Sequence, residues 1–466
     1  SEFFADSSKS VGRINPPKVF WGLLACLGAF IKKGMRTRVF KFIFCLLPLL
    51  LSLKPMEMEA QPKGYLYDDE EVLSYDLPDL LLGLDGKRIR TAEDWATKRR
   101  PEILRLFEKE VFGRSPKKPN PLRFEVVEEA SQALKGKAKR KQILIHLGKG
   151  KKSLALNLLL YLPVRTKVPV SCFLTLNFLG NHTVHSDPAI RIPTSWVRDG
   201  NGAKNNQATD EGRGSRSSRW AIEAILDRGY AFATMYYGDI DPDFHDGFEN
   251  GVHGLYSSSE TNMRQSDDWA SIAGWAWGLS RGLDYLETDS QIDGKRVALM
   301  GHSRLGKTSL WAGALDQRFA LVISNNSGCG GAAISRRRFG ETVKRINTSF
   351  PHWFCENFKK YNDKENECPV DQHMLVALAA PRPVYIASAV EDRWADPHGE
   401  FLAGLHANPV YQLYKLPGMP ATKQPAVDQP VMGTIGYHVR TGKHDVTDFD
   451  WEQYLKFADK HLKAKK

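Results

Sequence analysis

The stretch that decides the fold is Arg296-Val-Ala-Leu-Met-Gly-His-Ser303-Arg-Leu-Gly-Lys307-Thr-Ser-Leu. It begins with a short apolar run, Val297 to Met300, which predicts a buried strand. A glycine, one further residue and Ser303 follow, and the residues from Lys307 to Ala314 have helical spacing. A strand, a tight turn that carries a serine and a helix make up a nucleophile elbow, which holds the serine hydroxyl at the carboxyl end of a sheet. Ser303 is therefore the candidate nucleophile.

The match to the generic Gly-x-Ser-x-Gly pattern is imperfect. Leu305 occupies the second glycine position, and Gly306 comes one residue later. A serine in this place can also be an ordinary helix cap. If Ser303 is the nucleophile, the backbone N–H of Arg304 donates to the oxyanion, as the residue after the nucleophile does in an elbow. Lys307 lies one helical turn after Ser303 and can face the same cleft.

Strands and helices alternate on both sides of this stretch. The predicted strands cover residues 142–147, 154–162, 168–176, 230–235, 321–324, 384–389 and 434–439. The predicted helices cover residues 92–111, 220–227, 268–286 and 450–462. Alternation of this kind implies a mostly parallel central sheet with helices on both faces. Together with the elbow it predicts an α/β-hydrolase fold in a single domain over residues 62–466.

The composition is that of a globular protein. The chain has 466 residues, of which 42% are hydrophobic and 26% charged, and this excludes disordered, collagen-like, coiled-coil and polytopic membrane proteins. The net charge is +11, but residues 1–61 alone hold nine basic and four acidic side chains. No basic helix with interleaved aromatic residues is evident, so we expect no nucleic-acid partner. The six cysteines form no Cys-x-x-Cys pair, which leaves a zinc ribbon without support.

The residues from Met35 onward are typical of a secretory signal peptide. Three basic residues follow Met35, and Phe42 to Leu53 is an apolar run of 12 residues before a polar stretch. The run is shorter than the roughly 20 residues of a spanning helix, so we expect no stable membrane anchor. The sequence predicts a leader over residues 1–61, with a signal peptide over about 35–60 that is cleaved near Ala60. It follows that the protein is secreted or periplasmic.

The candidate base is a histidine near the end of the chain. In an α/β hydrolase the catalytic histidine comes last in chain order, and the candidates are His398, His406, His438 and His444. His438 lies within the predicted last strand, where its side chain packs rather than reacts. His444 lies in the loop between the last strand and the last helix, from which a base can reach over Ser303. We therefore predict that His444 is the base.

Several motifs resemble carbohydrate esterase family 15, the glucuronoyl esterases. The segment Gly301-His302-Ser303-Arg304-Leu305-Gly306-Lys307 is similar to the serine motif of that family. Other segments that resemble its bacterial branch are Ser327 to Ala333, Arg219-Trp220, Arg228 to Tyr230, Phe350 to Trp353 and Pro369 to His373. The similarity covers roughly residues 65–463. It implies a serine esterase of the 4-O-methyl-glucuronoyl methylesterase type that needs no metal or cofactor.

The resemblance also implies roles for individual side chains. The guanidinium of Arg304 would add a charged donor to the oxyanion site. Lys307, Glu341 and Trp394 would contact the hydroxyl groups and the ring of a glucuronoyl group. Each residue also has an ordinary structural interpretation, such as a surface ion pair for Arg304 or a salt-bridged helix residue for Glu341.

The motifs offer two positions for the acid of the triad. One branch of the family has a glutamate just before the Ser-Gly-x-Gly-Gly segment, and here Asn326 occupies that position. An amide cannot balance the charge of an imidazolium. Asp392 follows a predicted strand, which is the usual α/β-hydrolase position, and we expect it within hydrogen-bond reach of His444. Glu391 and Asp396 are alternatives, and either could instead cap the following helix.

These observations predict a Ser303–His444–Asp392 esterase. Its substrates would be esters of glucuronic or 4-O-methylglucuronic acid on glucuronoxylan, which link that polymer to lignin alcohols in the plant cell wall. We expect a monomer. Two alternatives stay open: an acetyl xylan esterase on the same fold, and a carbohydrate-binding relative without turnover.

Overall fold

A ten-stranded sheet is the centre of the computed structural model. The structure describes residues 61–150, 152–165, 167, 169–256 and 264–463. Apart from residue 61, the predicted leader and its signal peptide lie outside this range. Among the described residues, no helix has both the length and the apolar character that a membrane crossing requires.

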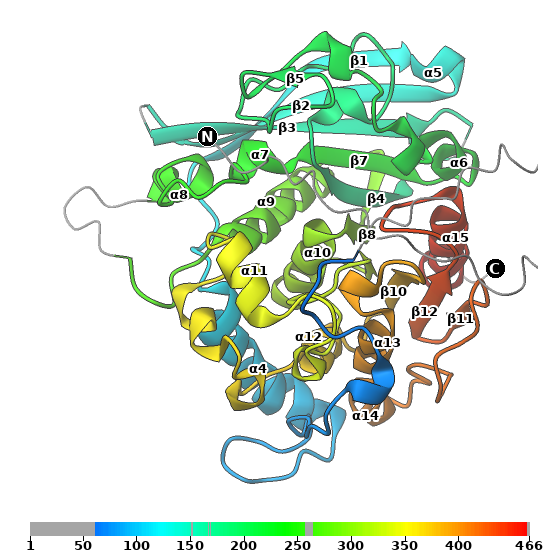
Figure 1. The fold of residues 1–466 in the computed structure, drawn as a ribbon. Coiled ribbons are helices and arrows are strands. Elements are labelled where there is room, and N and C mark those ends of the chain that lie inside the picture. Colours follow the sequence, from blue (N-terminus) through cyan, green and yellow to red (C-terminus); the bar gives the residue numbers. More distant parts are fainter. Residues whose placement is uncertain (1–60, 151, 166, 168, 257–263, 464–466) are drawn as a thin grey trace, which may run out of the picture. The chain divides into compact units, whose positions relative to one another are not determined.

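The strands of this sheet occur in the order β1-β2-β3-β7-β4-β8-β9-β10-β12-β11 (Figure 1). Six consecutive strands of the sheet, β7-β4-β8-β9-β10-β12, run parallel to one another. The strands β1, β2 and β3 on one side and β11 on the other pair antiparallel. Their bounds are β1 Leu122–Gln132, β2 Ala138–Lys149, β3 Lys152–Pro163, β4 Val170–Asn177, β7 Ala231–Tyr236, β8 Ile292–His302, β9 Leu321–Asn325, β10 Val384–Ala389, β11 Val431–Met432 and β12 Ile435–Arg440. The short strands β5 Ala203–Lys204 and β6 Gln207–Ala208 form a separate ribbon.

Helices cover both faces of the sheet (Figure 1). The helices are α3 Ala92–Asp94, α4 Arg100–Phe107, α5 Ala133–Gly136, α6 Ile222–Asp227, α7 Tyr237–Ile240, α8 Gly251–Tyr256, α9 Ser271–Leu286, α10 Arg304–Leu315, α11 Val343–Ser349, α12 Gln372–Ala377, α13 Pro397–His406, α14 Asn408–Leu413 and α15 Asp448–Leu462. Because successive strand residues point to opposite faces, the sheet contributes to two separate hydrophobic cores. Phe173 packs in the core beneath α6 and α15, and Leu174 in the larger core beneath α4, α9 and α10.

The predicted α/β-hydrolase architecture is confirmed, and most predicted elements are present. The predicted helix over residues 92–111 is a continuous helical stretch in which α3 and α4 alternate with π-helical turns at Trp95–Arg99 and Glu108–Phe112. Helix α10 begins at Arg304 rather than Lys307, because Ser303 is itself the last residue of the turn. Strand β1 was not expected, since a register shift between Val126 and Glu128 interrupts its alternation of apolar and charged residues.

The sequence left open whether the cysteines form disulfides. Within the described residues, Cys172, Cys329, Cys355 and Cys368 are all free and buried. Their thiols are packed in the core as small apolar groups.

Candidate active site

The turn between β8 and α10 has the backbone geometry of a nucleophile elbow. Ser303 has φ 57° and ψ −129°, a conformation that L-residues other than glycine rarely adopt. Its N–H donates to the carbonyl of Asn325, 2.8 Å away at the end of β9. In the described part of the chain no hydrogen bond engages the Ser303 hydroxyl. The turn therefore presents a free hydroxyl at the carboxyl end of the parallel strands.

Two glycines allow the turn to be this tight. A Cβ atom at Gly301 would lie 1.9 Å from the carbonyl oxygen of Leu305, so no other residue fits there. A Cβ atom at Gly306 would lie 3.0 Å from the Cβ of Ser327. Gly306, one residue later than in the generic motif, thus lets α10 pack closely against the loop that follows β9.

His444 and Asp392 are joined by a short hydrogen bond. The two atoms are His444 Nδ1 and Asp392 Oδ2, and they lie 2.6 Å apart. The histidine side chain is 40% exposed, whereas that of Asp392 is 5% exposed. The ring of His444 also lies against that of His302, the residue before Ser303, with 4.6 Å between the centroids. The structure thus brings the predicted base and acid together beside the elbow.

Asn326 contacts the same carboxylate. Its Nδ2 donates to Asp392 Oδ2 over 2.8 Å. Burial acts to raise the pKa of Asp392, but the charge of His444 and the hydrogen bonds from His444 and Asn326 outweigh it and hold that pKa below its ordinary value. The amide at the alternative acid position therefore supports a carboxylate instead of replacing one.

The other candidate acids, Asp396 and Glu391, and the candidate base His438 do not take part in the contact between His444 and Asp392. Asp396 accepts from the N–H of Gly399 at the start of α13 and binds Arg337 Nε at 2.7 Å, and Glu391 is exposed. His438 is fully buried in β12, as expected, and its Nε2 lies 2.9 Å from Asp450 Oδ1. Within the described residues, neither Asp396 nor Glu391 hydrogen-bonds to His444, whose carboxylate partner is Asp392.

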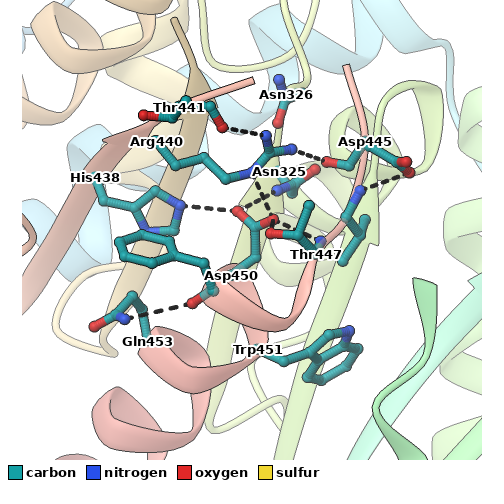
Figure 2. A network of polar contacts seen from close by, with 12 residues as sticks. Asn325, Asn326, His438, Arg440, Thr441, Asp445, Thr447, Asp450, Trp451 and Gln453 are labelled. Atoms are coloured by element: carbon teal, nitrogen blue, oxygen red, sulfur yellow. Dashed lines mark hydrogen bonds and ion pairs between the residues drawn. The ribbon is translucent and has the colours of Figure 1, made fainter. Parts of the chain in front are cut away.

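A buried polar network holds the loop that carries His444 (Figure 2). Arg440, at the end of β12, donates to the backbone carbonyls of Lys443 at 3.1 Å and Asp445 at 2.6 Å, which flank His444. Arg440 Nε donates to Asp450 Oδ2 at 2.7 Å, and Asp450 Oδ1 accepts from Asn325 Nδ2 at 3.3 Å. Since Asn325 also binds the Ser303 N–H, one network reaches both the histidine loop and the elbow.

Arg304 follows Ser303 and is the first residue of α10. Its guanidinium forms an ion pair with Asp243, a buried carboxylate, and lies over the ring of Trp353 at 4.8 Å from the centroid. Asp243 also accepts from Trp353 Nε1 at 2.7 Å and from the hydroxyl of Tyr237 at 2.8 Å. These contacts fix the guanidinium next to the candidate nucleophile. The ordinary interpretation, an ion pair with a carboxylate, describes the contact with Asp243, but this pair is only partly exposed: the Arg304 side chain is 22% exposed and that of Asp243 is fully buried.

Lys307, Glu341 and Trp394 also lie together. Lys307 Nζ is 4.0 Å from Glu341 Oε2 and donates to the carbonyl of Ser327. The N–H of Glu341 donates to the carbonyl of Trp394 at 3.1 Å. Burial lowers the pKa of Lys307 and raises that of Glu341, and the mutual attraction of the two charges opposes both shifts. Glu341 precedes α11 rather than lying within a helix.

A small cavity lies on the Arg304 side of the elbow. Its volume is about 150 Å³, and Asn177, Phe178 and Leu179 at the end of β4 line it together with Arg304 and Arg219. Trp196 lies in the long loop that follows β4 and precedes α6. Trp196 is not part of the lining and packs against Phe244 at 4.8 Å between ring centroids.

Comparison with known proteins identifies the family. A family model described as fungal glucuronyl esterase matches residues 256–414. One similar structure is that of a promiscuous esterase of carbohydrate esterase family 15 (CE15) from a marine bacterial metagenome. It is 52% identical, the match covers 86% of this chain and 100% of that chain, and the TM-score is 0.81. This chain belongs to carbohydrate esterase family 15.

Other members of family 15 agree with this assignment. A glucuronoyl esterase structure from Solibacter usitatus is 47% identical, with 85% of this chain and 100% of that chain covered and a TM-score of 0.81. The 4-O-methyl-glucuronoyl methylesterase of Schizophyllum commune is 26% identical over 350 residues, 73% of this chain and 74% of that protein. The protein is therefore a carboxylic ester hydrolase of the glucuronoyl esterase family.

Two carboxylates of this esterase were not singled out from the sequence. Asp243 lies in Asp239-Ile-Asp241-Pro-Asp243, just past a strand, and this acidic run at the active edge of the sheet was a usable signal. Glu400 is fully buried in α13 and accepts from the N–H groups of Ser327 and Gly328 at 2.7 and 3.0 Å. Glu400 supports the loop whose Ser327 carbonyl binds Lys307. Nothing in its local sequence distinguishes it from a surface glutamate.

Among the described residues, no group of three or more His, Cys, Asp or Glu side chains is arranged to hold a metal ion.

Proposed function

We propose that this esterase hydrolyses esters of glucuronic or 4-O-methylglucuronic acid on glucuronoxylan, including ester links to lignin alcohols. The observation that carries the mechanism is the 2.6 Å hydrogen bond between His444 and Asp392 beside the strained elbow at Ser303. The buried pair of Lys307 and Glu341 next to Trp394 supports a sugar substrate, because sugar hydroxyls need donors and acceptors while an aromatic ring covers an apolar sugar face.

The first half-reaction forms an acyl-enzyme. Ser303 Oγ attacks the ester carbonyl carbon while His444 Nε2 accepts the hydroxyl proton. Asp392 accepts the hydrogen bond from His444 Nδ1–H, which fixes the tautomer and balances the imidazolium charge. The oxyanion accepts hydrogen bonds from the backbone N–H and the guanidinium of Arg304. The C–O bond to the alcohol then breaks, and the alcohol leaves with the proton from His444.

The second half-reaction releases the uronic acid. Water attacks the acyl carbon while His444 again accepts a proton, and the bond to Ser303 Oγ breaks as the serine regains its proton. Ionised Asp392 is required throughout, and its lowered pKa keeps it ionised in mildly acidic solution.

A second substrate class has specific support. One relative, 52% identical, is described as promiscuous, so we also propose activity on acetyl esters of xylan. Turnover of benzyl glucuronate and of an aryl acetate, measured side by side, separates the two. A glucuronoyl esterase prefers the former by at least tenfold in kcat/KM, an acetyl esterase prefers the latter, and a binding protein without activity turns over neither.

Lys307→Ala tests recognition of the uronate. We expect kcat/KM for benzyl glucuronate to fall about 10- to 150-fold, the equivalent of about 1.5–3 kcal/mol for a lost charged hydrogen bond, with a much smaller change for aryl acetate. Lys141→Ala is the matched control, because Lys141 is also a little-exposed lysine paired with a carboxylate, Asp289 at 2.9 Å. Equal losses on both substrates would assign Lys307 a structural role.

We further propose that the predicted signal peptide exports the enzyme to a polymeric substrate outside the cytoplasm, where it acts as a monomer. Expression from Met35 in a bacterial host, followed by N-terminal sequencing of exported protein, tests the cleavage near Ala60. Retention in the cytoplasm contradicts it.

A further inference from the structure

A basic groove lies beside the residues predicted to contact the sugar. Its volume is about 650 Å³, and it is formed by the lead-in at residues 63–73 and by the chain from Arg336 into α11. In Figure 1 the lead-in, drawn in blue, passes between α11 and α13. The lead-in is held there by a hydrogen bond from the Gly340 N–H to the Leu66 carbonyl at 2.8 Å and by Asp69, which accepts from His398 Nδ1 at 3.0 Å.

Cationic side chains dominate the lining. The basic residues are Lys63, Arg336, Arg337, Arg338, Lys344 and Arg345, against the acidic residues Glu71 and Asp363. Four of the six cations have carboxylate partners: Arg336 pairs with Asp371, Arg337 with Asp396, and Arg338 and Lys344 with Asp363. Lys63 and Arg345 are exposed and form no ion pair with any residue that the structure describes. Lys63 and Arg345 are therefore two solvent-facing cations that an anionic ligand can reach, and Glu71 is an exposed carboxylate in the same lining.

The groove adjoins the predicted sugar contacts. Tyr65, in its lining, packs edge-on against Trp394 at 4.9 Å between ring centroids. On the other wall, Thr342 directly follows Glu341. Arg345 lies close enough to Glu341 to oppose, together with Lys307 and Arg304, the rise that burial causes in the pKa of that carboxyl. A carbohydrate chain that places one residue against Trp394 and Glu341 can thus continue over Tyr65 into the groove.

We propose that Lys63 and Arg345 bind free uronate carboxylates on the same carbohydrate chain that carries the ester. The inference rests on the proposed function and extends it. Each turnover converts a neutral ester into a carboxylate, so a chain with several uronic acids becomes more anionic as hydrolysis proceeds. Carboxylates accept charge-assisted hydrogen bonds from lysine and arginine. The groove then favours chains that already carry free uronates over neutral ones.

The test uses two xylo-oligosaccharides of equal length. One carries a single glucuronate methyl ester, and the other carries the same ester together with one free glucuronate. We expect wild-type KM to be lower for the second substrate, and Lys63→Ala/Arg345→Ala to raise that KM about three- to tenfold with kcat unchanged. Salt should remove the same preference, because it screens exposed charges. KM for the first substrate should stay as in the wild type.

Arg90→Ala/Lys423→Ala is the matched control. Both residues are exposed, form no ion pair with any described residue and lie outside the groove lining. Equal effects of the two double variants would show a general charge effect and overturn the proposal, as would a wild type with no preference between the substrates. An equal loss on both substrates in the groove variant would mean that Arg345 acts through Glu341, and it would also overturn the proposed binding of free carboxylates. Failure of the wild type on both substrates would instead contradict the proposed function, which the benzyl glucuronate assay tests separately.

Discussion

Ser303 has a backbone conformation that costs a non-glycine residue about 1–3 kcal/mol, and the surrounding turn enforces it. Gly301 leaves no room for a side chain, and the Ser303 N–H is bound to Asn325. In this strained conformation the Ser303 hydroxyl forms no hydrogen bond with any described residue. The proposed nucleophile and the strained backbone are thus the same residue, so substitutions there can separate the loss of the hydroxyl from the relief of strain.

Ser303→Ala and Ser303→Gly form a pair for this purpose. We expect both to lower kcat by at least about 10³, because loss of a triad serine leaves only binding and oxyanion stabilisation. Ser303→Gly should melt at a higher temperature than Ser303→Ala, since glycine adopts positive φ without the steric cost. Kinetics and thermal unfolding of both variants measure this. Activity above a tenth of wild type in a folded variant would remove Ser303 from the mechanism.

We expect unequal roles for Asp392, which hydrogen-bonds His444, and for Asn326, which hydrogen-bonds Asp392. Asp392→Asn should lower kcat by about 10²–10⁴, because an amide neither fixes the correct tautomer nor balances the imidazolium. Asn326→Ala should cost much less, since it removes only one of the hydrogen bonds to the carboxylate. Steady-state kinetics at matched pH provides the comparison. A reversed order would place the essential interaction on Asn326.

At the scale of elements, the sequence predicted the helices, strands and turns that depend on the local pattern of residues. The strand, turn and helix around Ser303 are encoded by neighbouring residues, and so is the position of His444 between the last strand and the last helix. The contacts of Asp243 with Arg304 and of Glu400 with the loop after β9 join segments far apart in the chain. No spacing rule brings such pairs together. Only the order of the strands, with β9 and β10 adjacent, places Asn326 beside Asp392.

The junction of β12 and α15 should be sensitive to a single substitution. Arg440 and Asp450 are both buried, and removing one partner leaves an uncompensated charge that costs about 3–5 kcal/mol. Arg440→Met should therefore destabilise by about that amount and also lower kcat, because the carbonyls on both sides of His444 lose their donor. Denaturant unfolding and kinetics test this.

A double variant distinguishes the two effects. Arg440→Met/Asp450→Asn should recover part of the stability, because no lone buried charge remains, without recovery of kcat. If kcat returns together with stability, the network supports the fold only and does not position His444.

At the scale of the whole molecule, stability should depend on pH through Glu400. Burial raises the pKa of Glu400 to about 8, against about 4.3 in an unfolded chain. Between these values the folded state binds more protons than the unfolded state, so this contribution to stability falls as pH rises from about 4 to 8, by up to about 1.4 kcal/mol per pH unit. Glu400→Gln keeps the acceptor for Ser327 and Gly328 and removes the titration. Its melting temperature should fall less between pH 6 and 9 than that of the wild type, and parallel curves would contradict the assignment.

The four free cysteines of the described fold bear on how the enzyme can be made and handled. Since none of these thiols has to find a partner during maturation, this part of the chain can reach its native state in the reducing cytoplasm of an expression host, with no disulfide-forming oxidoreductase or disulfide isomerase. Dithiothreitol in the purification buffer should leave the melting temperature unchanged, and alkylating reagents should label these four sites only after unfolding, because all of them are buried.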